Sequence, residues 1–260
     1  MDLQELLKQG REALEIGDYS VALVRFKRVV EGAPDNVQAH QLLGEALVEA
    51  GHLRDAITAL LRARELAPQD IDVLFDLGDA YFEDHHPEKA LEVYQSILAI
   101  DATAADAWVS LGLVHFSQER VEKAEECYRQ ALAIDPESVF ALNSLGDTAF
   151  AQGHNDEALA YYRQVIALDP QDAQAHFNLA EMYYDLGELA TAASACRETL
   201  RLDPGFAFAY LTLGNICLDE EKPREALQYF QEFLLHEHAA DAAEIRAEVA
   251  AVIEGLKAEL

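Results

Sequence analysis

Hydrophobic positions recur along this chain with helical spacing, in pairs of segments separated by a short polar turn. In one stretch Leu74, Leu77 and Tyr81 lie three or four residues apart, which places them on one face of a helix. After a polar turn that ends at Pro87, a second series follows at Ala90, Leu91, Tyr94, Ile97 and Leu98. The pattern predicts a helical hairpin, and no part of the chain shows the alternation typical of strands.

This hairpin pattern repeats every 34 residues. One alanine marks the same position in each copy, at Ala22, Ala56, Ala90, Ala124, Ala158, Ala192 and Ala226. The spacing predicts seven repeats and a non-repeating tail, with bounds 3–36, 37–70, 71–104, 105–138, 139–172, 173–206, 207–240 and 241–260. Stacked repeats present an extended surface, which favours binding over catalysis.

A glycine recurs inside the first helix of the repeats, at Gly10, Gly44, Gly78, Gly112, Gly146 and Gly214, with Ala180 in its place once. Glycine inside a helix costs about 1 kcal/mol relative to alanine. We therefore interpret these positions as close approaches, in which the glycine of the first helix nests against the 34-spaced alanine of the second. A proline closes most repeats and stops the second helix, at Pro34, Pro68, Pro136, Pro170 and Pro204.

The fourth repeat carries a familiar set of residues at Trp108, Leu111, Gly112, Ala124, Tyr128, Ala131 and Pro136. With these residues the chain resembles the tetratricopeptide repeat (TPR) family over residues 3 to about 240. The resemblance implies an all-α fold: a right-handed superhelix, or solenoid, of seven TPR helical hairpins with a concave binding face. It implies no particular partner, because one fold serves many functions.

The tail has the pattern of one amphipathic helix. Asp241 with Glu244 indicates a helix start. Apolar residues then form a stripe at Ile245, Val249, Val252, Ile253, Leu256 and Leu260. We expect residues 241–260 to form a C-terminal capping helix that covers the last repeat.

By the family resemblance, the first helix of each repeat lines the concave face. One column there is aromatic in the middle repeats, at Phe82, Phe116, Phe150 and Tyr184, and a neighbouring column holds Phe75, Val109, Asn143, Phe177 and Leu211. Acidic and polar residues are interleaved with them at Asp76, Asp79, Asp147, Glu181, Ser110, Asn178 and Asn215. These residues form the predicted partner-binding groove; the alternative for the aromatic column is partial burial in helix packing.

Charge narrows the class of partner. The formal net charge of -29 argues against nucleic acid and anionic membrane, because both are bound through lysine and arginine. The third repeat alone carries a charge of -7 (1 minus 8). We therefore expect a protein or peptide partner with basic and apolar residues, bound toward the middle repeats, since exposed aromatic rings and carboxylates suit such a segment.

The compartment is inferred from what the sequence lacks. The cysteines Cys127, Cys196 and Cys217 form no even set and no Cys-x-x-Cys pair, which favours a reducing compartment. No apolar run is long enough to cross a bilayer, and the first residues lack the layout of a secretory signal. We expect a cytoplasmic protein, and the like charge of every copy favours a monomer.

No catalytic motif is present: we find no nucleophile elbow, phosphate-binding glycine loop or zinc spacing. The histidine pairs at His85–His86 and His236–His238 are interpreted as surface residues, so we expect no metal, no cofactor and no enzymatic activity. The sequence predicts a non-catalytic protein–protein interaction scaffold. Two alternatives remain open: a self-assembling structural scaffold, and a regulatory subunit of an enzyme encoded elsewhere.

Overall fold

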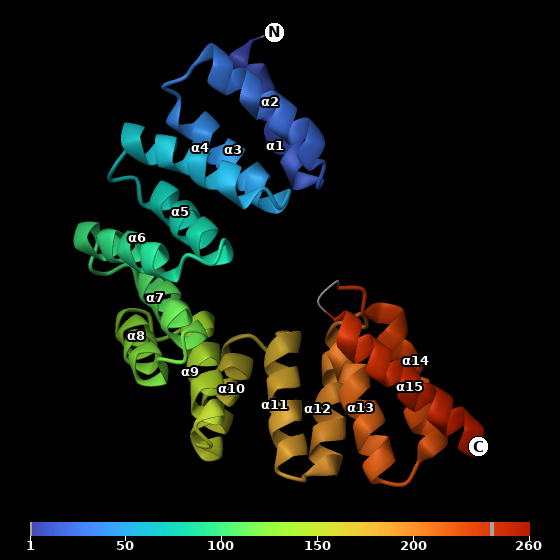
Figure 1. Ribbon diagram of the computed structural model, residues 1–260. Helices are drawn as coiled ribbons and strands as arrows, with labels where there is room; N and C mark the ends of the chain where they lie inside the picture. The colour runs from blue at the N-terminus through green and yellow to red at the C-terminus, as the bar shows by residue number, and fades with distance from the viewer. Residues whose placement is uncertain (1, 240–241) are drawn as a thin grey trace. The chain divides into compact units, whose positions relative to one another are not determined.

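The chain folds into helices joined by short turns (Figure 1). The structure, a computed structural model, describes residues 2–239 and 242–260. In that part of the chain the helices are α1 Leu3–Glu15, α2 Tyr19–Gly32, α3 Val37–Glu49, α4 Leu53–Leu66, α5 Ile71–Glu83, α6 Pro87–Ile100, α7 Ala105–Ser117, α8 Val121–Ile134, α9 Val139–Ala151, α10 Asn155–Leu168, α11 Ala173–Asp185, α12 Leu189–Leu202, α13 Ala207–Asp219, α14 Pro223–His236 and α15 Ala243–Glu259. They form two compact units, unit 1 (Met1–Ala141) and unit 2 (Leu142–Leu260).

Helix α1 and each odd-numbered helix up to α13 begin at the residue where a predicted repeat begins. Each packs against the helix that follows it, as in α1 with α2, α7 with α8 and α13 with α14. Aspartate or asparagine caps several of these helices; the side chain of Asp70, for example, accepts a hydrogen bond from the backbone N–H of Val73. The architecture is therefore the expected all-α array of helical hairpins.

The recurring glycines do mark close approaches, but our expectation about their partners was wrong. The 34-spaced alanines are fully buried. The glycine, however, faces the large side chain that stands sixteen residues later on the second helix, and not the alanine. A Cβ added at Gly214 would lie 2.6 Å from Cδ1 of Phe230, and one added at Gly78 would lie 2.5 Å from Cε1 of Tyr94. Glycine is present because a buried ring or branched side chain fills the space that a Cβ would need.

One repeat reverses this pairing of sizes. Where the glycine is replaced by Ala180, the residue sixteen positions later is Cys196, the smallest side chain in that column. Both residues are fully buried in the same cluster of unit 2. The larger residue on one helix is thus matched by a smaller residue on the other, and the packing stays dense.

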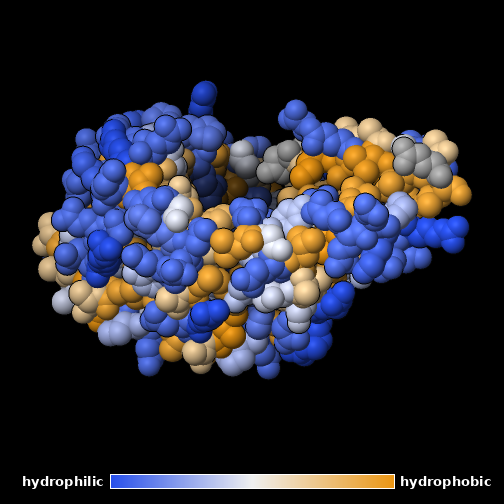
Figure 2. Space-filling view, turned by 90° about the horizontal axis from the view of Figure 1, so that it is seen from below, coloured by the Kyte–Doolittle hydropathy of each residue, from blue (hydrophilic) through white to orange (hydrophobic). Residues whose placement is uncertain are grey.

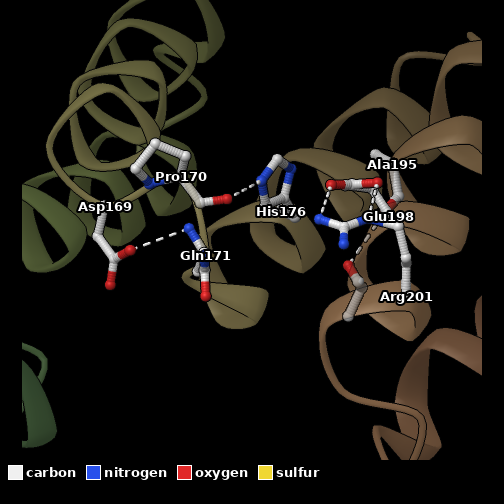
Figure 3. A network of polar contacts seen from close by, with 8 residues as sticks. Asp169, Pro170, Gln171, His176, Ala195, Glu198 and Arg201 are labelled. Atoms are coloured by element: carbon white, nitrogen blue, oxygen red, sulfur yellow. Dashed lines mark hydrogen bonds and ion pairs between the residues drawn. The ribbon is translucent and has the colours of Figure 1, made fainter.

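Successive hairpins are connected by a hydrogen bond to the proline turn. Ring nitrogens of His40 and His176 lie 2.9 Å from the carbonyl oxygen of Pro34 and 3.3 Å from that of Pro170, respectively. Figure 3 shows the second of these contacts, together with the neighbouring turn in which Asp169 accepts a bond from the backbone N–H of Gln171. The polar residue at the fourth position of a repeat therefore holds the start of its first helix against the turn before it.

The turn inside each hairpin has one residue with positive φ. Glycine occupies it at Gly17, Gly51, Gly153 and Gly187, with φ between 74° and 76°. The equivalent residues His85, Glu119 and Glu221 adopt φ of 56°, 59° and 58°. Side chains other than glycine are strained in this left-handed region.

We expect Glu119→Gly to stabilise the protein by about 0.5–1 kcal/mol. The substitution removes a left-handed strain of about 1–2 kcal/mol, and the greater freedom of glycine in the unfolded chain offsets part of that gain. Chemical denaturation followed by circular dichroism measures the change. The reverse substitution, Gly51→Glu, is the control and should destabilise; a loss of stability in Glu119→Gly would contradict the interpretation.

Helix α15 covers the last hairpin. Val249, Ile253 and Leu256 are buried against Phe230 and Phe233 of α14, as expected for a capping helix. Arg246 donates a hydrogen bond of 3.1 Å to the backbone carbonyl of Leu234 in the last turn of α14, which satisfies an acceptor that the helix end leaves free. The expected helix start at Asp241 lies outside the described residues.

The apolar stripe of α15 is only partly covered. Val252 and Leu260 are 40% and 50% exposed, and Leu235 on α14 is 62% exposed. Figure 2 shows hydrophobic side chains gathered at the right of the view, where Figure 1 places the C-terminal helices, while hydrophilic side chains dominate much of the remaining face. No helix in the described part of the chain is both long and apolar enough to cross a membrane.

Candidate binding surfaces

The residues predicted to bind a partner lie on the first helices of the hairpins and fall into two sets. The unit 1 face comprises Phe75, Asp76, Asp79 and Phe82 of α5 with Val109, Ser110 and Phe116 of α7. The unit 2 face comprises Asn143, Asp147 and Phe150 of α9, Phe177, Asn178, Glu181 and Tyr184 of α11, and Leu211 and Asn215 of α13. Within unit 1, Figure 1 shows α5 and α7 on the inner side of the curve and α6 and α8 on the outer side.

The aromatic residues of the unit 1 face are half-buried. Phe75, Phe82 and Phe116 each keep part of the ring accessible to solvent. The Phe75 ring also packs against Tyr94, with 6.4 Å between centroids. Val109 differs from the expectation: it is only 6% exposed, because it belongs to the packing between helices. Half-buried rings are anchored by their own helix and still present a face to a ligand.

Two carboxylates are fixed by tyrosines of the second helix. The hydroxyl of Tyr94 donates to Oδ1 of Asp79 at 2.5 Å, and the hydroxyl of Tyr162 donates to Oδ1 of Asp147 at 2.6 Å. The tyrosine rings are those that fill the space beside Gly78 and Gly146. In both hairpins, the same glycine-to-ring packing therefore orients an exposed carboxylate on the predicted binding face.

Asp76 is the most perturbed acid of the unit 1 face. Its pKa is raised to about 6, first by burial and then by the negative charges of Glu45, Asp79 and Asp72, although a hydrogen bond from Gln41 lowers it. Gln41 donates this bond across from α3, at 2.8 Å. Burial likewise raises the pKa of Asp79. No lysine or arginine of the described residues pairs with Asp76 or Asp79, which favours a ligand that brings positive charge.

The unit 2 face has the same character and also carries two acids, Asp147 and Glu181. Burial raises the pKa of Asp147 and of Glu181, and the neighbouring Asp185 raises that of Glu181 further. The Tyr184 hydroxyl donates to Oδ2 of Asp219 on α13 at 2.9 Å. Phe150, Tyr184 and Leu211 are half-buried.

Phe177 departs from the expected exposed column. It is 6% exposed, because its ring packs against Phe206 with 4.8 Å between centroids. The asparagines of this face are half-buried, and Oδ1 of Asn178 accepts a bond of 2.7 Å from Gln174. Oδ1 of Asn143 is buried and accepts no hydrogen bond from the described residues.

Sequence reasoning missed two features of these surfaces. Phe140 on α9 is 74% exposed and shares a helix face with Asn143 and Asp147, three and seven residues later. Arg11 lines a pocket of about 370 Å³ between α1 and α3, together with Glu45 and Glu49. The predicted groove would have included Phe140 if it had been extended to the first two residues of each first helix. It would have included Arg11 if it had been extended to the first repeat.

Reactive groups are buried or dispersed in the described part of the chain. All three cysteines are free and buried, and burial raises the pKa of Cys127 to about 11 and that of Cys196 to about 12. Thiols with raised pKa values are poor nucleophiles. Among the described residues, no three His, Cys, Asp or Glu side chains gather as metal ligands do.

Comparison with protein families gives one consistent result. Three models described as tetratricopeptide repeat match residues 13–77, 103–171 and 143–205. A comparison with curated proteins gave no match.

Solved structures agree with the family models. A tetratricopeptide repeat protein from Parabacteroides merdae ATCC 43184 superimposes with a TM-score of 0.77 at 21% identity, over 97% of this chain and 98% of the other. The MamA protein is 27% identical over 66% of this chain and 94% of its own, with a TM-score of 0.55. The APC/C hetero-tetramer Cut9–Hcn1 contains a chain that matches at 16% identity and a TM-score of 0.70, over 95% of this chain and 52% of that one.

Proposed function

Because this chain belongs to the tetratricopeptide repeat family, we propose that it is a non-catalytic scaffold that binds a basic, partly apolar segment of a partner protein. The fold generally mediates protein–protein interactions. In this proposal the segment lies along the first helices of the hairpins, on the unit 1 face or on the unit 2 face. The protein acts as a cytoplasmic monomer, and neither nucleic acid nor membrane is its partner.

One observation carries the choice of a basic segment: uncompensated acids lie beside half-buried aromatic rings. On the unit 1 face, Asp76 and Asp79 follow Phe75 along α5, and Phe82 lies one turn further on. A lysine or arginine that binds there relieves the repulsion among the carboxylates and gains contact with an aromatic face. Apolar residues of the segment would cover the remaining ring surface.

We expect the double variant Phe82→Ala/Phe116→Ala to lose most of its partner in a pull-down from lysate of the source cells, followed by mass spectrometry. The variant removes two half-buried rings from the unit 1 face, and truncation of aromatic anchors weakens interfaces by about 2 kcal/mol or more. Raising the salt concentration from about 50 to about 500 mM should also weaken capture by the wild type, because screening removes the acidic contribution.

The matched control is Ile100→Ala/Ile134→Ala, which truncates two exposed apolar residues at the ends of the second helices α6 and α8. This variant should retain the partner. Circular dichroism must show that both variants keep their helix content. Equal capture by both variants, or capture that is insensitive to salt, would contradict the proposal.

A further inference from the structure

A pocket of about 540 Å³ lies in unit 1 where α5 and α7 end and α6 begins. It is lined by Phe82, Glu83, His85, Pro87, Ser117 and Gln118. Phe82 belongs to the unit 1 face, so the pocket continues that face toward the turns of the hairpins. Its wall combines an aromatic ring and a proline with a small number of polar groups, a composition typical of a site for one side chain or a small ligand.

The orientation of the Gln118 amide leaves an acceptor unused. Its Nε2 donates to Oε1 of Glu88 at 3.0 Å, and Arg120 donates to the same carboxylate oxygen at 3.3 Å. Because a carboxylate accepts hydrogen bonds, the amide nitrogen must face Glu88 and the amide oxygen must point elsewhere. That oxygen, Oε1, is buried and accepts no bond from the described residues. A buried acceptor without a donor costs free energy, which a ligand that donates to it would recover.

Glu83 supplies negative charge to the wall of the pocket. Burial raises the pKa of its carboxyl, and the charges of Asp79 and Glu49 raise it further. No ion pair joins Glu83 to a cation of the described residues. The nearby cations have other partners: Arg120 pairs with Glu88, and Lys89 lies over the Tyr81 ring at 5.0 Å from its centroid. The pocket thus offers hydrogen-bond acceptors on Gln118 and Glu83. No lysine or arginine of the described residues pairs with Glu83.

We propose that this pocket receives an arginine side chain of the bound segment. The guanidinium stacks on the Phe82 ring and donates to the Glu83 carboxylate and to Oε1 of Gln118. Arginine fits better than lysine, because its planar fork carries five N–H donors that can serve two acceptors while its face covers an aromatic ring. The inference rests on the proposed function and names the residue that the groove recognises.

The turn beside the pocket contributes part of its wall. His85, which lines the pocket, has φ of 56° at the position where most repeats have glycine. Its side chain forms part of the wall at the expense of backbone strain. The positive φ itself belongs to the repeat, because the equivalent turn residue adopts it in each of the seven hairpins.

The test uses N-acetyl-L-arginine methylamide as the probe, titrated into the full-length protein and followed by amide chemical shifts in NMR spectra. The neutral probe is N-acetyl-L-citrulline methylamide, which has nearly the same shape without the charge. We expect saturable shifts centred on His85, Ser117 and Gln118 with the arginine probe, and affinity for the citrulline probe lower by about tenfold, the loss expected when a charge-assisted hydrogen bond is removed.

Glu83→Gln should lower the affinity for the arginine probe by about tenfold, whereas the matched control Glu92→Gln, on the exposed outer surface of α6, should change it by less than about twofold. Absence of saturable binding, shifts centred elsewhere, or equal affinity for the two probes would each overturn the pocket assignment. Equal loss in Glu83→Gln and Glu92→Gln would overturn it too. The pull-down with Phe82→Ala/Phe116→Ala decides the groove function separately, since it depends on no particular side chain of the partner.

Discussion

Cys196→Phe will destabilise the protein by about 1–3 kcal/mol, and adding Ala180→Gly to that variant will recover most of the loss. A large ring at position 196 meets the Cβ of Ala180, as the ring of Phe230 would meet a Cβ at Gly214, where the added carbon would lie 2.6 Å from Cδ1. The double variant recreates the combination of glycine and phenylalanine that Gly214 and Phe230 form in the last repeat.

The informative quantity is the sign of the change that Ala180→Gly causes in the free energy of unfolding, measured in two backgrounds. In the wild type this substitution should cost about 1 kcal/mol, because glycine is a poor helix former. In the Cys196→Phe background the same substitution should stabilise, because it removes the steric conflict. Such a reversal measures the coupling between the two positions directly.

A double-mutant cycle compares the wild type, Ala180→Gly, Cys196→Phe and the double variant. Chemical denaturation followed by circular dichroism gives the stability of each. The midpoint of the transition is the safer readout, since repeat arrays can depart from two-state unfolding. If Ala180→Gly destabilised both backgrounds by the same amount, the two residues would be independent and the account of the glycine column would be wrong.

Asp76→Asn should stabilise the protein at pH 8 by about 1–3 kcal/mol and leave its stability unchanged near pH 4. In the folded protein the pKa of Asp76 is raised from the model-compound value of 3.8 to about 6, chiefly by burial. Each pKa unit corresponds to about 1.4 kcal/mol of stability. The substitution keeps an amide oxygen that can accept the hydrogen bond from Gln41, so the packing is conserved.

The direction of this pH dependence follows from the protons that Asp76 binds in the folded and unfolded states. Between pH 4 and pH 6 the folded protein holds a proton on Asp76 that the unfolded chain has already released. Raising the pH through this range therefore lowers the stability of the wild type, and the full penalty is present above pH 6. Well below pH 3.8 the carboxyl is protonated in both states, and the penalty disappears.

Denaturation at a series of pH values tests this expectation, with Glu92→Gln as the control for the loss of one negative charge at an exposed site. The difference between Asp76→Asn and the wild type should increase from pH 4 to pH 7, while that of the control should stay small. A variant less stable than the wild type at pH 8 would show that the carboxylate stabilises the fold, contrary to our interpretation.

The arrangement of helices could be predicted from the sequence because the same pattern occurs in every repeat. The alanine at Ala124 and its equivalents fixed the spacing, and the proline and aspartate at the end of repeats marked where one helix stops and the next begins. Local rules for helix ends are reliable when they agree in several copies. The start of each first helix, such as Ala105 for α7, therefore coincides with the predicted boundary.

The packing partners and the exposure of single residues could not be predicted in the same way. Spacing places Gly112 and Ala124 on facing helices, but it does not say which residue of the second helix stands opposite the glycine; that depends on how the two helices cross. Val109 and Phe177 share a column with half-buried residues and are themselves buried. For Phe177 the cause is the ring of Phe206, which belongs to the start of the following hairpin.

The pairing of Ala180 with Cys196 has a consequence for how such a chain can evolve. The two residues lie on neighbouring helices of one hairpin, so a change at one can be compensated by a second change only sixteen residues away, with every other copy left intact. Each repeat can therefore accumulate such paired substitutions independently of the other repeats. A lineage of such chains can thereby diversify the packing inside its hairpins copy by copy while the architecture is inherited unaltered.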